Sequence, residues 1–360
     1  MAILVDLPDA TVPDNPEWRA RRALAAEWAQ MLATDSTLGM ETTLVLYRNA
    51  RANNADLPAS AWLWEVTSPL PISAEAVEAA PAVPFEEVLS THSILLAPTE
   101  FSTTAPLKVA ARRLGFRAAT MAGFSLEMVP ALRLDFTDVD RRVRALASRL
   151  EVAEAAHFVF QVDATEYKLT LDLRFRAPHV SSGLLHEPGT AGNVPSGETY
   201  IVPYEGEGKE PSRTAGLLPV QLEGESEGPN GEIVIYRIEA NTAVAVASTG
   251  PVSTQEAERL AAEPAYGNMA ELGLGVLGVY GLEPIGEVML DEKLGLHIAF
   301  GRSEHFGGIT GPDRFSRPEA VVHIDRVYLP QLQPKVQVVA VDLELPSGER
   351  EALMRDGAYV

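Results

Sequence analysis

The chain has 360 residues, of which 46% are hydrophobic and 22% are charged, and this composition is typical of a globular protein with room for two domains. It contains no cysteine, so disulfide scaffolds, thiol nucleophiles and iron–sulfur clusters are excluded and a metal must bind through His, Asp, Glu and water. The 50 Asp and Glu against 29 Lys and Arg give a net charge of −21, which argues against a nucleic-acid partner.

The start of the chain, MAILVDLPDATVPDNPEW, turns acidic and proline-rich at once, and no long uncharged apolar window follows it. A membrane span needs about 18 such residues, and a signal peptide needs an apolar stretch after basic residues. We therefore expect no membrane span, no signal peptide, no membrane partner and a cytoplasmic protein.

The first half of the sequence predicts alternating strands and helices. Residues 17–32 (EWRARRALAAEWAQML) have apolar residues three and four apart, a pattern that favours a helix. Residues 42–47 (TTLVLY) and 93–97 (SILLA) are short apolar runs typical of a parallel sheet. Two further helices are favoured, one at residues 106–114, which a glycine follows, and one at residues 135–150. An open α/β domain is therefore expected here.

The second half of the sequence is β-rich. Near Phe158 the pattern changes to long runs in which apolar and polar residues alternate (HFVFQVDATEYKLTLDLRF, then EIVIYRIEANTAVAVAST), as expected for half-buried strands. The acidic, glycine-rich residues 205–230 predict a loop or hairpin, and 254–263 a short helix. In the first half, the proline-rich residues 58–84 predict loops with at most a broken helix.

The predicted fold class is therefore α/β with two domains. We expect an N-terminal open α/β domain at residues 1–180, followed by a β-rich α+β domain at residues 181–360.

Histidines near carboxylates mark the C-terminal region as a candidate metal site. His297 follows Glu292 by five residues in LDEKLGLHIAFG, and Glu304 precedes His305 in GRSEHFGG. In VVHIDRV, His323 and Asp325 are two apart on a predicted strand, so both side chains face the same side. An imidazole and a carboxylate on one rigid strand could bind one ion, although such a pair also occurs as an ordinary surface or core pair.

Two further carboxylates strengthen the hypothesis of a metal site. Glu198 in PSGETY and Glu271 in AELGLG lie in apolar, glycine-containing surroundings, where an unpaired carboxylate is costly and a cation would offset the cost. The expected set suits two divalent ions that share one bridging carboxylate and a water, and it comprises Glu198, Glu271, Glu292, His297, His323 and Asp325. Composition alone equally allows solvated acidic residues.

These residues lie in ordered blocks that resemble the thermophilic metallo-aminopeptidase family, of the aminopeptidase T and aminopeptidase S type. The blocks are AATMAGFSLEMV, AGNVPSGETYIVP, AELGLG, DEKLGLHIAFG, FGG and VHID, spread over nearly the whole chain. The resemblance implies that Glu198 binds a first metal, that Glu271 bridges two metals, and that His297 is a further ligand. It also implies that Glu292, His323 and Asp325 complete the set.

The resemblance further implies two divalent ions, with zinc as the expected metal and cobalt, manganese or iron as alternatives, together with a peptide substrate and a homodimer. One residue departs from the pattern, because the family places a catalytic Tyr seven residues after His297 where this chain has Glu304. A carboxylate cannot replace a neutral phenol as donor to an oxyanion unless its pKa is strongly raised. Glu304 and His305 are nevertheless the expected catalytic positions.

Three functions follow from this reasoning. The first is a metal-dependent aminopeptidase acting on the N-terminus of peptides. The second, motivated by Glu304, is a peptide-binding protein that keeps the fold without hydrolysis, as the resemblance to crocagin-biosynthesis proteins of a modified-peptide pathway implies. The third is a non-haem iron dioxygenase similar to the pyridinediol ring-cleaving enzymes, a branch that expects a His where this chain has Glu271.

Several other residues have expected roles. Lys293 and Arg302 are expected to pair either with a substrate carboxylate or with neighbouring ligands. The loop 99–104 (TEFSTT) lacks a nucleotide-binding pattern and is assigned no cofactor. A groove for a long peptide would be sought at residues 158–176 and 205–230.

Overall fold

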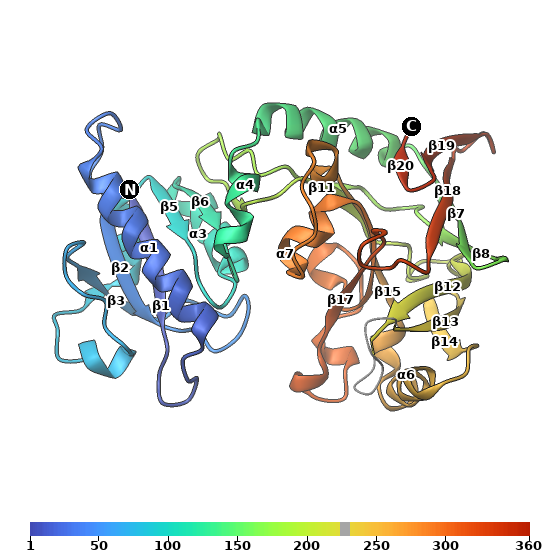
Figure 1. Ribbon diagram of the computed structural model, residues 1–360, viewed down its shortest axis with the longest axis horizontal. Coiled ribbons are helices and arrows are strands. Elements are labelled where there is room, and N and C mark those ends of the chain that lie inside the picture. The colour runs from blue at the N-terminus through green and yellow to red at the C-terminus, as the bar shows by residue number, and fades with distance from the viewer. Residues whose placement is uncertain (224–230) are drawn as a thin grey trace. The chain divides into compact units, whose positions relative to one another are not determined.

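The computed structural model describes residues 1–223 and 231–360. The chain divides into two compact units, each built from two stretches of sequence. The first unit comprises Met1–Phe136 and Gly183–Ser196, and the second comprises Thr137–Ser182 and Gly197–Val360 (Figure 1). The sequence suggests one boundary near residue 180. In the structure, residues 137–182 belong to the second unit and residues 183–196 to the first.

The first unit is an open α/β sheet of seven strands in the order β10-β6-β5-β1-β2-β3-β4. The strands β1, β2, β5, β6 and β10 pair in parallel, while β3 and β4 are antiparallel to their neighbours. Their bounds are β1 Ala2–Leu7, β2 Thr43–Arg48, β3 Ser60–Trp64, β4 Val83–Pro84, β5 Ile94–Ala97, β6 Arg117–Thr120 and β10 Ala191–Asn193.

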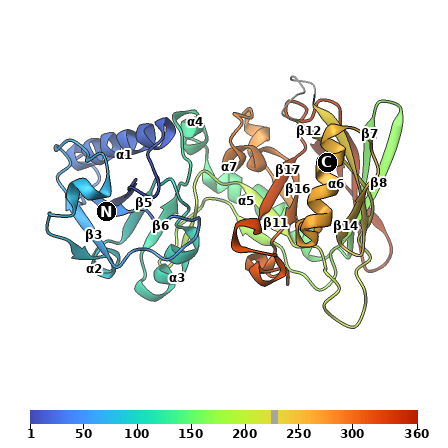
Figure 2. The same cartoon turned by 90° about the horizontal axis from the view of Figure 1, so that it is seen from below.

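Helices cover both faces of this sheet, with α1 on one side and α2 and α3 on the other (Figure 2). All six residues of the central strand β1 are buried. Helices cover both faces of the sheet at this strand, which accounts for its continuous apolar run AILV. The helix bounds are α1 Pro16–Thr34, α2 Phe85–Thr91, α3 Thr104–Leu114 and α4 Val129–Leu132, with 3-10 turns η1 Ala74–Val77 and η2 Leu126–Met128.

The expected helices and strands of this unit are confirmed. Helix α1 begins one residue before and ends two residues after its predicted bounds, and α3 begins two residues earlier than predicted. Several elements were not anticipated, among them the helix α2. The strand β1 was missed although its apolar run is typical of a buried parallel strand. The prediction of loops and at most a broken helix for residues 58–84 was wrong in part, because residues 60–64 form β3, whose Ala61 and Trp62 are buried.

The second unit contains an antiparallel sheet of eight strands in the order β14-β13-β12-β8-β7-β18-β19-β20. The long helix α5 (Phe136–Glu151) buries Val139, Val143, Leu146 and Leu150, and α6 (Pro251–Ala262) confirms the second predicted helix. The strand bounds are β7 Ala155–Val162, β8 Thr165–Asp172, β12 Ala215–Leu222, β13 Glu232–Glu239, β14 Thr242–Val246, β18 Gln337–Glu344, β19 Arg350–Arg355 and β20 Ala358–Tyr359.

A separate five-stranded sheet in the second unit has the order β17-β16-β15-β11-β9. Its antiparallel strands are β9 His179–Ser181, β11 Glu198–Ile201, β15 Met269–Gly275, β16 Leu296–Gly301 and β17 His323–Val327. The short elements of the unit are α7 Val288–Asp291 and the 3-10 turns η3 Pro264–Gly267, η4 Leu277–Tyr280, η5 Glu292–Leu294, η6 Glu304–Phe306, η7 Pro312–Arg314 and η8 Pro318–Ala320.

The expected mixed α/β fold is confirmed. Within the described residues, no helix has the length and apolar character that crossing a bilayer requires. The predicted hairpin at residues 205–230 includes β12, while residues 224–230 lie outside the described part.

Candidate metal centre

The five-stranded sheet gathers the predicted metal ligands on one of its faces. Residues directly opposite each other in an antiparallel ladder point to the same side. Glu198 of β11 pairs with Gly275 of β15, and Gly273 pairs with His297 of β16. Asp325 of β17 pairs with Ala299 of β16 in the next ladder. Four strands that are distant in sequence therefore supply side chains to one place.

Two glycines of the AELGLG segment make room for these side chains. A Cβ at Gly273 would lie 1.9 Å from Nε2 of His297, so the imidazole lies across the strand where any other residue would carry a side chain. A Cβ at Gly275 would lie 2.2 Å from the carbonyl carbon of Lys293, so the turn η5 packs directly on the strand. Residues 271, 273 and 275 of β15 all face the same side of the sheet. Glu271 supplies a carboxylate there, while Gly273 leaves room for His297 and Gly275 leaves room for the turn that carries Lys293.

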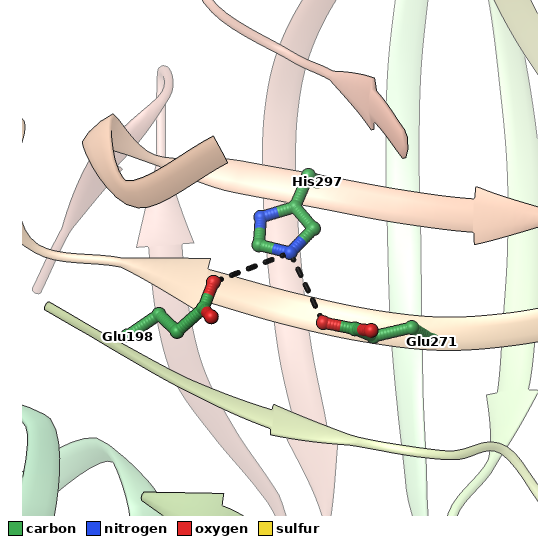
Figure 3. Close-up of side chains that lie close together, drawn as sticks. All are labelled: Glu198, Glu271 and His297. Carbon is green, nitrogen blue, oxygen red and sulfur yellow. Dashed lines mark hydrogen bonds and ion pairs between the residues drawn. The ribbon is translucent and has the colours of Figure 1, made fainter. Parts of the chain in front are cut away.

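Glu198, Glu271 and His297 form the buried part of the centre, and they come from three adjacent strands (Figure 3). Nε2 of His297 lies 3.2 Å from Oε1 of Glu271 and 3.6 Å from Oε2 of Glu198. The three residues are between 1% and 5% exposed. Burial opposes ionisation of Glu271, but hydrogen bonds from His297 and His323 lower the pKa of its carboxyl group.

His323, Asp325 and the same Glu271 form a second group of potential ligands. Nε2 of His323 lies 3.3 Å from Oε2 of Glu271 and 3.5 Å from Oδ1 of Asp325. Nδ1 of His323 bonds to the carbonyl oxygen of Arg302 at 2.9 Å, which requires a proton on Nδ1. Nε2 therefore faces two carboxylate oxygens either as an imidazolium or with its lone pair available to a metal.

The chemistry of this donor set fits a divalent cation. Four ligand atoms bound at about 2.0–2.2 Å around a tetrahedral ion lie roughly 3.3–3.6 Å apart, and the distances of 3.2–3.6 Å within each group match this spacing. Three buried atoms here, Oε2 of Glu198, Nδ1 of His297 and Oδ1 of Asp325, have no hydrogen-bond partner in the described structure. A buried carboxylate oxygen without a partner is costly, and a cation would relieve that cost at Glu198 and Asp325.

Glu292, the sixth predicted ligand, belongs to a third group with His297 and Asp325. Its neighbour Lys293 is 2% exposed, and its ammonium group donates to Oε1 of Glu198 at 2.5 Å and to Glu292. Burial opposes the charge of Lys293, but the two carboxylates outweigh it and raise the pKa of the ammonium group. The structure thus brings all six predicted residues together, and a lysine lies among them.

The predicted catalytic residues Glu304 and His305 lie in the turn η6, beside His323. The imidazole rings of His305 and His323 have centroids 5.7 Å apart. Both oxygens of Glu304 accept from the Arg302 guanidinium, and this pairing lowers the pKa of Glu304. Burial and the nearby charge of His323 lower the pKa of His305 to about 4, so His305 is neutral at pH 7.

Glu205, a buried carboxylate that no motif of the sequence marks, holds this turn in place. Its Oε1 accepts from Asn268, Ser303 and Thr310, each at 2.8 Å, and its Oε2 accepts from the backbone N–H of Ile309 at 2.5 Å. The acidic run around Glu205 predicted a solvated loop and so concealed this role. Only the fold brings residue 205 beside residues 303–310.

Two further predictions for the second unit concern the partners of Lys293 and Arg302 and a peptide groove at residues 158–176. Lys293 and Arg302 are both engaged with neighbouring carboxylates, which corresponds to pairing within the site. The run 158–176 forms β7 and the strand β8, which lie inside the eight-stranded sheet, where β18 pairs with β7 and β12 with part of β8. Only the beginning of β8 keeps an unpaired side in the described sheet.

Comparison with known proteins places the fold. No family model and no curated protein sequence matches the chain. The structure is similar to that of 2,5-dihydroxypyridine dioxygenase from Pseudomonas putida KT2440, with a TM-score of 0.59 and 15% sequence identity over 100% of this chain and 92% of that one. It is also similar to AmpT, an aminopeptidase T from Thermus thermophilus, with a TM-score of 0.55 and 14% identity over 100% and 94% of the two chains. The chain therefore shares its fold with both this dioxygenase and AmpT.

Proposed function

We propose that the protein is a metal-dependent, aminopeptidase-like hydrolase that acts on the N-terminus of peptides. The observation that carries the proposal is the position of Glu271, whose two oxygens face different imidazoles, Oε1 toward His297 and Oε2 toward His323. A carboxylate in this position suits a ligand shared between two cation positions. The fold shared with AmpT supports the same reading.

Five of the six residues divide into two cation positions that share Glu271. One lies between Glu271, His323 and Asp325, and the other between Glu198, Glu271 and His297. A divalent ion here would polarise the scissile carbonyl group and lower the pKa of a bound water toward neutrality. Zinc suits the His and carboxylate donors, with cobalt, manganese and iron as alternatives.

The surrounding side chains suit the handling of protons and of a free amine. His305 is neutral at pH 7 and lies next to His323, so it can accept a proton from water that attacks the substrate. Glu304 is ionised and held by Arg302, so it cannot donate a hydrogen bond to an oxyanion but can attract an ammonium group. We therefore propose slow hydrolysis with retained recognition of the substrate's α-amine.

A comparison of blocked and free substrates tests this function. The zinc-loaded protein is incubated with a tripeptide carrying either a free or an acetylated N-terminus, and release of the first residue is followed by chromatography. We expect slow release from the free peptide only, abolished in a Glu271→Ala variant. Equal rates on both peptides, or the same rate in the variant, would contradict the proposal.

A second candidate is a peptide-binding protein that retains the fold without hydrolysis, and the Arg302–Glu304 pair favours it because the expected oxyanion donor is missing. Calorimetric titration with a peptide of about a dozen residues separates the two functions. Binding that survives both acetylation and Glu271→Ala supports the binding protein. The fold shared with a dioxygenase keeps a third test useful, namely oxygen uptake by the iron-loaded protein with a dihydroxypyridine.

A further inference from the structure

We propose that the ammonium group of Lys293 is a permanent cation of this centre, so that the protein binds one divalent ion tightly, between Glu271, His323 and Asp325. The inference rests on the proposed metal-dependent function, since it concerns the metal content of the same site. It departs from the two-ion expectation of the sequence, because the second positive charge is supplied by the chain itself.

The first observation is the position of the ammonium group between two of the predicted ligands. Nζ of Lys293 lies 2.5 Å from Oε1 of Glu198 and donates a second hydrogen bond to Glu292. The side chain of Lys293 is 2% exposed, that of Glu198 6% and that of Glu292 16%. A buried ammonium is stable only where carboxylates surround it. Lys293 thus does for these two carboxylates what a metal ion would do.

The second observation is that the backbone holds Lys293 in this place. The turn η5 packs so closely on β15 that a Cβ at Gly275 would lie 2.2 Å from the carbonyl carbon of Lys293 and 2.6 Å from the carbonyl oxygen of Glu292. The backbone of Lys293 therefore lies directly on the face of the sheet. Its buried stem leaves the ammonium group little freedom to move away when a metal arrives.

The third observation is the difference between the two cation positions. An ion bound between Glu198, Glu271 and His297 would share Glu198 with the ammonium group of Lys293, and positive charges on either side of one buried carboxylate repel each other strongly. The other position has no lysine or arginine side chain bonded to its ligands among the described residues. There the carbonyl oxygen of Arg302 holds Nδ1 of His323, so that Nε2 faces Glu271 and Asp325.

The test is the number of zinc ions bound by the full chain with and without the ammonium group. Metal-free wild-type protein and a Lys293→Met variant are titrated with zinc by calorimetry, and bound zinc is counted after gel filtration. We expect one tight ion in the wild type, with any second ion at least about a hundredfold weaker, and two tight ions in the variant. Lys335→Met is the matched control, since Nζ of Lys335 bonds the carbonyl oxygen of Gly231 away from the centre, and it should bind one ion.

A spectroscopic measurement gives a readout that does not depend on activity. Manganese loaded into the wild type should give the paramagnetic resonance spectrum of isolated Mn²⁺ ions. In Lys293→Met, two ions that share Glu271 should give a spin-coupled spectrum.

The outcomes separate this inference from the proposed function. Two tight ions in the wild type, or one ion in folded Lys293→Met, would overturn the inference and leave metal-dependent chemistry standing. No zinc in the wild type would contradict both. If Lys293→Met does not fold, the wild-type count alone decides, and Lys293→Arg, which keeps the charge, should match it with one ion.

Discussion

Gly273 lies directly opposite His297 in the ladder between β15 and β16, and a side chain at this glycine would begin 1.9 Å from Nε2 of the imidazole. We predict that Gly273→Ala displaces His297 and with it Glu271, which Nε2 of His297 contacts at 3.2 Å. Zinc binding should weaken by at least about tenfold, since loss of a partner that orients a ligand typically costs about 10–100-fold. Overpacking of this kind also costs about 1–3 kcal/mol of stability.

Zinc titration and thermal unfolding of the variant check this prediction. Gly192→Ala is the control, because a Cβ there meets only the side chain of Leu185 at 3.4 Å and the backbone has no positive φ. Unchanged zinc affinity in Gly273→Ala would show that the position of His297 does not matter for binding.

Glu271 contacts both imidazoles of the centre, and its removal should therefore affect both cation positions. We predict that Glu271→Ala weakens zinc binding by more than about a hundredfold, which exceeds the roughly 10–100-fold effect of losing a partner that only orients a ligand. Glu349→Ala, in the second PSGE segment, should have no effect because Glu349 is exposed in the turn between β18 and β19. Equal zinc affinities in the two variants would contradict the assignment of Glu271.

Metal binding should depend on pH because the imidazoles must lose a proton first. Burial opposes the charge of His297, but Glu271 and Glu198 outweigh it and raise its pKa from 6.5 to about 9. A zinc ion on Glu271 repels the protonated imidazole of His297 beside it, so zinc binding below about pH 9 releases this proton. We therefore expect the affinity to rise by up to about tenfold per pH unit and to level off above pH 9. The zinc affinity is measured at several pH values by competition with a chelator that buffers free zinc. An affinity independent of pH between 6 and 8 would show that His297 carries no proton to displace.

The same shift predicts the opposite trend for the stability of the metal-free protein. Because the folded-state pKa of His297 is raised, its contribution to stability is fully present below about pH 6.5 and is lost as the pH rises through about 9. Denaturant unfolding of metal-free wild type and His297→Gln should show a difference that shrinks over this window. A constant difference would argue against a charged His297.

The resemblance inferred from the sequence implies a tyrosine donor at the position that Glu304 occupies. Loss of one oxyanion donor typically costs on the order of a hundred- to a thousandfold in turnover. We therefore predict that Glu304→Tyr raises the hydrolysis of a free-amine tripeptide by up to this factor, in protein shown to carry zinc. If the zinc-loaded variant gains nothing, the missing donor is not what limits turnover.

Glu205 accepts four hydrogen bonds that hold the turn carrying His305. We predict that Glu205→Gln loosens this turn, because the amide of Gln must turn one N–H donor toward groups that are themselves donors. Hydrogen exchange at residues 303–310 should accelerate, with a stability loss of about 1–3 kcal/mol. Glu283→Gln, at an exposed carboxylate that accepts from Gln331, is the control, and similar exchange in both variants would contradict the role of Glu205.

Local patterns in the sequence were sufficient for much of the fold. The three- and four-residue spacing in α1 and α5, and the alternation in β7 and β13, report directly which face of each element is buried. Such patterns fail where burial is two-sided or the segment is short. Accordingly β1 and β3 were missed, and the grouping of residues 183–196 with the first unit had no local signal.

Local sequence was also sufficient to identify residues suited to bind a metal, because only His, Asp and Glu were available and they stand in apolar, glycine-containing segments. It placed His323 and Asp325 on one face of a strand, since that follows from the period of two. The tertiary structure alone decided that the ammonium group of Lys293 lies between Glu198 and Glu292. That contact depends on the ladder between β11 and β15 and on the close approach of η5 to Gly275, and long-range packing of this kind leaves no periodic trace in the chain.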